Sequence, residues 1–153
     1  MDFLGLNYYT RDFIRWGGVT PMGLLGIPCD AGRHNGKAQR SSMGWEIYPQ
    51  GLTSLLRDFQ SYKLPILITE NGISTPSDLL RWRFIRAHVE ELFKAMSEGI
   101  QVLGYLYWSL IDNFEWTHGF GPRFGLIDID YATQARRVRP SARSRWPTDS
   151  GVR

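Results

Sequence analysis

The chain has 153 residues, of which 42% are hydrophobic and 22% charged, which suffices for one globular core but not for two comfortable domains. This composition excludes a disordered tail, a collagen-like repeat and a coiled coil. No run approaches the roughly 18 consecutive apolar residues of a membrane span, and no basic segment followed by an apolar one opens the chain. Because the sequence also has a single cysteine, Cys29, we expect a soluble protein of the reducing cytoplasm.

The net charge of +3 is unevenly distributed. Residues 132–153 contain six arginines and one acidic residue and carry +5, so the preceding 131 residues carry −2. The basic character therefore belongs to the C-terminal end rather than to a surface of the whole domain. We expect neither a nucleic-acid partner nor a membrane partner.

The first predicted element is a strand. Residues 3–9 (FLGLNYY) form a short, aromatic-rich apolar run that ends in polar side chains. This pattern favours a buried strand that delivers Asn7 and Tyr9 to its exposed end. Residues 10–45 then include seven glycines and two prolines and show no periodicity. We predict a long loop there, and loops of this length often carry function.

Helical and strand-like patterns alternate after the loop. Residues 64–72 (LPILITENG) form a second run of strand length that ends in a carboxylate, an amide and a turn glycine. The helix before this run is predicted from apolar residues at helical spacing: Leu52, Leu55, Leu56 and Phe59. The helix after it is predicted to have Thr75 as N-cap and Pro76 at its first position, and to end at Gly99. Its predicted apolar stripe consists of Ile85, Val89, Leu92, Phe93 and Met96.

Residues 102–110 form a third strand-like run that again leads into polar side chains. The order strand, helix, strand, helix, strand implies an α/β fold with parallel strands joined by right-handed crossovers. In such folds the functional side chains lie at the carboxyl ends of the strands. We therefore expect one face of the molecule to gather Asn7, Tyr9, Glu70, Trp108, Glu115 and Trp116.

Glu70 is the strongest single candidate for catalysis. It lies two positions after a run of four apolar residues, 65–68, in a predicted buried strand, where a carboxylate is costly without partners. Trp108, Glu115 and Trp116 add aromatic faces and a second acid after the next strand, a composition suited to stacking a sugar ring and holding its hydroxyls. The alternative interpretation is a buried aromatic core beside a solvated acid, and the residues alone do not decide between the two.

Four sequence blocks carry a specific pattern. Three of them are DFLGLNYY at residues 2–9, ITENG at 68–72, and YWSLIDNFEW at 107–116 followed by RFGL at 123–126. The fourth, MGWEIYP, lies at residues 43–49. In this order and spacing, the blocks resemble glycoside hydrolase family 1, the β-glucosidases. The resemblance covers roughly residues 2–140 and implies the C-terminal part of a (β/α)8 TIM barrel, from about its sixth strand to its eighth.

The resemblance also implies roles for individual residues. Glu70 resembles the nucleophile of a retaining mechanism, which forms a covalent glycosyl-enzyme. Tyr9 resembles the tyrosine whose hydroxyl hydrogen-bonds that nucleophile, and Trp108 the platform beneath the sugar. The remaining substrate-binding residues that the resemblance implies are Asn7, Glu115, Trp116 and Phe124. It implies a small carbohydrate as substrate, a terminal β-D-glucoside or a cellobiose-type oligosaccharide, and neither a metal nor an organic cofactor.

The sequence departs from the family in one catalytic feature. A retaining glycosidase needs two carboxylates about 5–5.5 Å apart, and the resemblance implies that the second lies in an Asn-Glu-Pro block that this sequence lacks. Glu115 is not expected to substitute, because its matched role is binding hydroxyls. We therefore expect the isolated chain to be inactive or nearly so, with the missing N-terminal part of the barrel as a partner. The alternatives are a non-catalytic truncated product, a degenerate sugar-binding module and, within the enzyme class, a 6-phospho-β-glycosidase.

The sequence is also short for a complete barrel and atypical at its end. A (β/α)8 barrel takes about 250 residues, so residues 1–140 are predicted to form only the C-terminal part of one. Residues 141–153 are predicted to be a non-matching basic tail, because Pro147 and Gly151 interrupt the expected closing helix.

Overall fold

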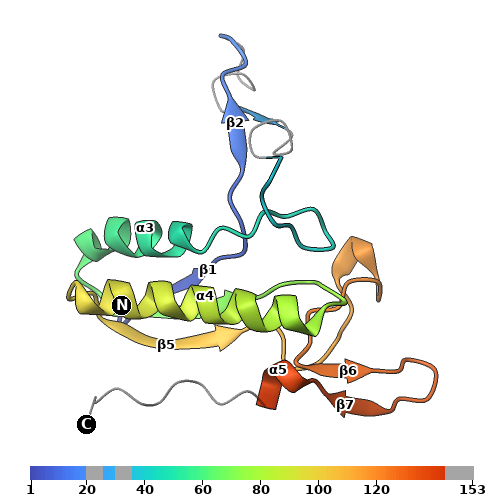
Figure 1. Cartoon of the computed structure of the whole chain (residues 1–153). Coiled ribbons are helices and arrows are strands. Elements are labelled where there is room, and N and C mark those ends of the chain that lie inside the picture. The colour runs from blue at the N-terminus through green and yellow to red at the C-terminus, as the bar shows by residue number, and fades with distance from the viewer. Residues whose placement is uncertain (20–25, 30–35, 144–153) are drawn as a thin grey trace.

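A computed structural model of the chain describes residues 1–19, 26–29 and 36–143. Its centre is a parallel three-stranded sheet of order β1-β4-β5, formed by β1 (Leu4–Asn7), β4 (Ile66–Asn71) and β5 (Val102–Tyr107). The three predicted strands are thus present, adjacent and parallel, and the crossovers α3 and α4 lie side by side over the sheet (Figure 1).

The register aligns the carboxyl ends of the three strands. Asn7 pairs with Glu70 between β1 and β4, and Asn71 pairs with Tyr107 between β4 and β5. Irregularities interrupt the register just before both pairs. As a result, the polar residues that follow each strand emerge at one edge of the sheet.

Helix α3 (Gln50–Phe59) covers one face of the sheet and continues into a 3-10 turn, η1 (Gln60–Tyr62). The predicted apolar spacing is confirmed, since Leu52 and Leu56 are fully buried against Ile66 and Ile68 of the central strand. Burying a leucine or isoleucine side chain contributes about 1.5–3 kcal/mol, so this cluster holds the helix to the sheet.

Helix α4 (Asp78–Ser97) begins later than predicted. Its N-cap is Ser77, whose hydroxyl accepts a hydrogen bond from the Leu80 backbone N–H at 3.3 Å. The prediction of Thr75 was wrong because the polar groups of that residue bind elsewhere. Its hydroxyl accepts from the Ser77 backbone N–H, and its own N–H donates to the carbonyl of Arg123.

The buried face of α4 also differs from the predicted stripe. Ile85 and Leu92 are buried as expected, but Phe93 and Met96 are 63% and 45% exposed. The helix is rotated so that two polar residues replace them on its inner face, where the buried set comprises Arg81, Phe84, Ile85, His88, Leu92 and Ala95. The prediction of this buried face was wrong because it considered apolar residues alone and so could not include a buried arginine and histidine.

Part of the predicted long loop is a two-stranded antiparallel sheet. Strand β2 (Phe13–Arg15) pairs with β3 (Ile27–Cys29), and the pair extends away from the central sheet (Figure 1). Three-residue strands are too short to show a period of two, and one of them contains Pro28, which explains why the sequence gave no signal. Residues 20–25 and 30–35 lie outside the described part.

The region after β5 contains a second small antiparallel sheet. The sheet is formed by the paired strands β6 (Ile127–Ile129) and β7 (Arg136–Val138). A 3-10 turn, η2 (Trp116–His118), precedes it, and a short helix, α5 (Pro140–Arg143), follows it. Helix α5 packs on α4, because both the backbone N–H and the hydroxyl of Ser141 donate to the Asp78 carboxylate. The rest of the predicted basic tail, residues 144–153, is outside the described part.

The face of the sheet opposite α3 and α4 has no covering layer in the described part of the chain. Residues that alternate with the core positions are exposed there, among them Asn7 and Leu106. Among residues 1–19, 26–29 and 36–143, strands β1 and β5 each pair on one side only, so both edges of this sheet lack a partner strand there. No helix among the described residues has the length and apolar character needed to cross a membrane.

Candidate active site

Glu70 lies at the carboxyl end of the central strand and is half-buried. Its Oε2 atom accepts a hydrogen bond from the Tyr9 hydroxyl at 2.7 Å. The two residues are 61 positions apart in sequence, and the parallel pairing of β1 with β4 brings them together. This contact fixes one oxygen of the carboxylate.

Burial raises the pKa of the Tyr9 hydroxyl above its ordinary value of 10.0, and the hydrogen bond to Glu70 and the charge of that carboxylate raise it further. A more distant contribution comes from the charge of Glu115. Because the pKa lies far above neutrality, Tyr9 is a protonated donor at physiological pH.

Two aromatic rings hold the ring of Tyr9 in place. Its centroid lies 5.6 Å from that of Trp45 and 6.2 Å from that of Phe124, both in edge-on geometry. Trp45 and Phe124 also contact one another at 6.2 Å. Phe124 is 2% exposed, so it forms a buried wall behind the Tyr9–Glu70 pair.

Trp108 and Glu115, after β5, form a second polar contact. The indole Nε1–H of Trp108 donates to Glu115 Oε1 at 3.2 Å. The backbone of Trp108 lies directly against the end of the central strand, where its N–H donates to the Asn71 carbonyl at 2.9 Å. A Cβ atom built on Gly72 would lie 1.7 Å from the Trp108 carbonyl oxygen, so only glycine permits this approach.

The structure places the two remaining predicted residues less centrally. The Asn7 side chain is exposed, and its Oδ1 accepts from the Thr69 hydroxyl at 2.6 Å. Trp116 lies at the start of η2, with a positive φ of 49° and 83% of its surface exposed. Of the seven predicted site residues, five are thus drawn into two contact groups: Tyr9, Glu70 and Phe124 in one, and Trp108 and Glu115 in the other.

Asn71 is a residue whose importance the sequence prediction missed. It is fully buried, its Nδ2 donates to the Tyr8 carbonyl at 2.6 Å, and its Oδ1 accepts from the Tyr105 hydroxyl at 2.7 Å. One amide therefore ties together the ends of all three strands. The available signal was an amide directly after a buried strand, where its polar atoms require partners.

The segment that carries Trp45 is held beside Tyr9 by an ion pair between half-buried Arg11 and buried Glu46. Arg11 donates to both carboxylate oxygens of Glu46, at 2.9 and 3.1 Å, and its guanidinium lies 3.7 Å from the centroid of the Tyr48 ring. The Thr10 hydroxyl also donates to the Glu46 carbonyl at 3.0 Å. These bonds connect the residues that immediately follow Tyr9 to those that flank Trp45.

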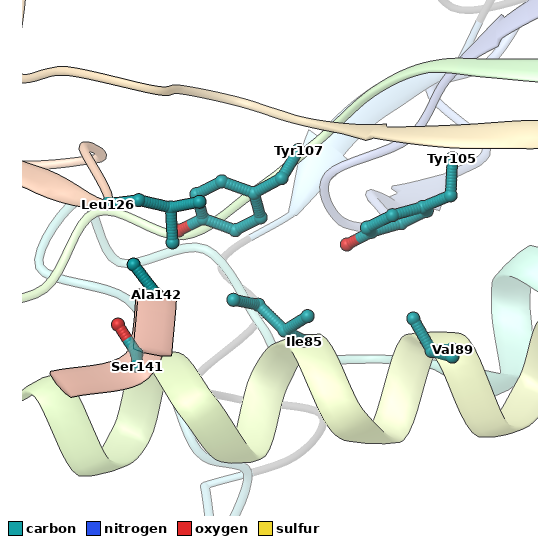
Figure 2. A pocket seen from close by; sticks show the side chains of 7 residues that line it. All are labelled: Ile85, Val89, Tyr105, Tyr107, Leu126, Ser141 and Ala142. Carbon is teal, nitrogen blue, oxygen red and sulfur yellow. The ribbon is translucent and has the colours of Figure 1, made fainter. Parts of the chain in front are cut away.

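A cavity of about 240 Å³ lies on the helix side of the sheet, away from the carboxylates. It is bounded by β5, α4 and α5, and Figure 2 shows Tyr105 and Tyr107 facing Ile85 and Val89 across it. Its lining is mainly apolar and contains no carboxylate. In the described part of the chain, no three His, Cys, Asp or Glu side chains lie together as a metal site requires.

Parallel strands with crossover helices, and candidate functional side chains at the carboxyl ends of those strands, are the arrangement expected of part of a (β/α)8 barrel. The sequence model of glycosyl hydrolase family 1 matches residues 1–149. The chain belongs to glycosyl hydrolase family 1.

Individual relatives agree with this assignment. A β-galactosidase of Sulfolobus acidocaldarius is 38% identical over 93% of this chain and 30% of its own length. The structure of a β-glycosidase from Pyrococcus horikoshii superposes with a TM-score of 0.85 and 42% identity, covering 92% of this chain and 32% of the other. A β-glucosidase from Thermotoga maritima in complex with glucoimidazole gives a TM-score of 0.83 and 34% identity, covering 93% of this chain and 33% of the other. The chain thus spans about a third of the length of these relatives.

Proposed function

We propose that this chain is the C-terminal part, about strands six to eight, of a retaining β-glycosidase that hydrolyses terminal β-D-glucosides or cellobiose-type oligosaccharides. The observation that carries the proposal is the 2.7 Å hydrogen bond from the Tyr9 hydroxyl to Glu70. An oriented, half-buried carboxylate at the carboxyl end of a barrel strand is suited to nucleophilic attack. Because the relatives include β-galactosidases, galactosides form the second substrate class to test.

In the proposed mechanism, the free oxygen of Glu70 attacks the anomeric carbon of the sugar. The bond to the leaving oxygen breaks, and that oxygen takes a proton from a general acid. Water then attacks the covalent glycosyl-enzyme, gives a proton to the same group and releases the sugar with retained configuration. Tyr9 keeps the nucleophile oriented through its donated hydrogen bond.

The other site residues would hold the sugar. Trp108 provides an indole face for stacking, and Glu115 and Trp116 bind outer hydroxyls through the carboxylate and the indole N–H. Asn7 and Phe124 line the same pocket. The bond between Trp108 and Glu115 supports these roles because it orients the Glu115 carboxylate beside the platform.

The general acid would come from the N-terminal part of the barrel. The chain has no Asn-Glu-Pro block. In the part that the structure describes, its sheet has two open edges and an uncovered face on the side of the Asn7 side chain. The remaining strands would complete both the barrel and the catalytic pair. The isolated chain would accordingly hydrolyse ordinary glucosides slowly or not at all.

A fluorinated glucoside with an activated leaving group tests the role of Glu70, since such a leaving group needs little acid assistance. Intact-mass analysis of the folded chain should show one added sugar, mapped to Glu70 and absent from Glu70→Gln. A matched Glu115→Gln variant should still form the adduct at Glu70, with weaker binding of the reagent. The galactose analogue compares the two substrate classes.

Two results would contradict the proposal. An adduct on another residue would remove Glu70 from its role. A folded chain that binds glucoimidazole without forming any adduct would instead support a degenerate sugar-binding module, and the absence of both binding and adduct would support a non-catalytic product.

A further inference from the structure

Three consecutive backbone carbonyls around Phe124 are each held by a side chain from a different element. The carbonyl of Arg123 accepts from Arg81 Nη2 of α4 at 2.9 Å, and that of Phe124 accepts from the Tyr107 hydroxyl of β5 at 3.0 Å. The carbonyl of Gly125 accepts from Arg139 Nη1, just after β7. The backbone of residues 123–125, here called the Phe124 segment, is therefore fixed at three consecutive carbonyls.

Arg81 has the most costly position of the three donors. Its side chain is fully buried, and a buried charge is unfavourable unless every contact compensates for it. Asp78 provides the nearby negative charge, with its Oδ1 3.0 Å from Arg81 Nη1. The other terminal nitrogen, Nη2, donates to two carbonyls, those of Thr75 at 2.6 Å and Arg123 at 2.9 Å.

These two carbonyls belong to the loops that follow the strands of the candidate site. Thr75 lies five residues after Glu70, and Arg123 directly precedes Phe124. The guanidinium therefore joins the loop after the central strand to the Phe124 segment. The Phe124 ring of that segment packs edge-on against Tyr9, which donates to Glu70.

We propose that Arg81 is a positioning residue for the active site, which holds the Phe124 ring against Tyr9 and thereby keeps the Tyr9 hydroxyl on Glu70. The inference rests on the proposed function in one respect, since Glu70 and Tyr9 are taken there as the working pair. Arg81 makes no contact with Glu70 or Tyr9 and acts through the carbonyls of Thr75 and Arg123. Ion pairing alone would not need this geometry, because Asp78 could pair with any buried cation.

The test compares Arg81→Lys with Arg81→Met. Lysine keeps the positive charge beside Asp78 but lacks the planar fork that bridges two carbonyls while pairing with a carboxylate. Arg86→Met is the matched control, because Arg86 lies on the same helix and forms an exposed ion pair with Glu90. The readout is the ¹⁹F NMR resonance of Tyr9 in the fluorotyrosine-labelled full chain, assigned by its loss in Tyr9→Phe and recorded alongside the urea unfolding midpoint.

We expect Arg81→Lys to recover most of the unfolding midpoint that Arg81→Met loses. In both variants, however, the ¹⁹F chemical shift of Tyr9 should move most of the way toward that of free fluorotyrosine. Arg86→Met should leave both measurements unchanged. If Arg81→Met does not fold, Arg81→Lys alone still gives the decisive spectrum.

A double-variant cycle with Phe124→Leu shows whether Arg81 acts through the Phe124 ring. Phe124→Leu should also move the ¹⁹F chemical shift of Tyr9 toward that of free fluorotyrosine. Adding Arg81→Lys to Phe124→Leu should not change this shift further. A Tyr9 resonance that stays in place in Arg81→Lys, or that moves additively in the double variant, would overturn the proposal. Because the measurement needs no turnover, it can succeed even if the adduct experiment removes Glu70 from its catalytic role.

Discussion

His88 makes the stability of this fold depend on pH in a calculable way. The imidazole is fully buried between α4 and the sheet, where its ring lies 3.9 Å from the Phe84 ring centroid and 5.9 Å from that of Tyr8. Nδ1 lies 2.8 Å from the Phe84 carbonyl, and Nε2 has no hydrogen-bond partner among the described residues. Burial lowers the pKa of His88 from 6.5 to about 4, because the Phe84 carbonyl and the charge of Glu91 compensate the charged form only partly for its lost hydration.

The direction of the effect follows from the pH at which the folded and the unfolded chain each bind the proton. The unfolded chain protonates His88 below pH 6.5, whereas the folded chain does so only below about pH 4. The free energy of unfolding is therefore constant above pH 6.5 with respect to this group and falls as the pH is lowered toward 4. Each unit of pKa difference corresponds to about 1.4 kcal/mol, which gives a loss of about 2 kcal/mol at pH 5 and a limit of about 3 kcal/mol.

Urea unfolding between pH 7.5 and 4.5 measures this loss. His88→Leu replaces the titrating imidazole with an apolar side chain of similar volume, so the unfolding free energy of this variant should change far less over this pH range. His118→Gln is the control, because that residue is exposed and should leave the slope intact. Asp78 and Asp112 have pKa values lowered below 3.8, and their stabilisation is lost only at more acidic pH. An unchanged wild-type free energy at pH 5, or an equal slope in His88→Leu, would refute the reasoning.

Three further changes probe other parts of the structure. Gly72→Ala should displace the Trp108 backbone, because the new Cβ would lie 1.7 Å from its carbonyl oxygen, and this should appear as weaker binding of glucoimidazole and a lower melting temperature. Leu56→Ala should lower the urea-measured free energy of unfolding by about 3 kcal/mol, the usual cost of a large cavity at a fully buried position. Asp112→Ala removes the buried acceptor of two hydrogen bonds from Arg139. It should lower the free energy of unfolding by about 2–3 kcal/mol in the same assay. An unchanged unfolding midpoint would show that this ion pair does not stabilise the fold.

The sequence predicted the central part of the fold because its signals are local. Apolar runs of strand length and the helical spacing of Leu52 and Leu56 depend on neighbours within a few residues, and both predictions were confirmed. The start of α4 was misplaced because three capping-type residues compete there, and the choice depends on a distant carbonyl, that of Arg123. The β2–β3 sheet was missed because its three-residue strands are defined only by each other.

The composition of the site was visible in the sequence, but its geometry was not. A carboxylate after a buried strand and aromatic residues after the next strand pointed to Glu70 and Trp108, since a buried polar group is costly unless it has partners. That Tyr9 donates to Glu70, and that buried Arg81 links the Phe124 segment to the loop after β4, depends on contacts between residues 42 to 61 positions apart. The sequence by itself determined the three strands of the central sheet, the two crossover helices and the candidate residues at the strand ends. The parallel register and the packing of α4 decided which of those side chains meet, because hydrogen bonds between distant residues depend on angles and distances that no local pattern contains.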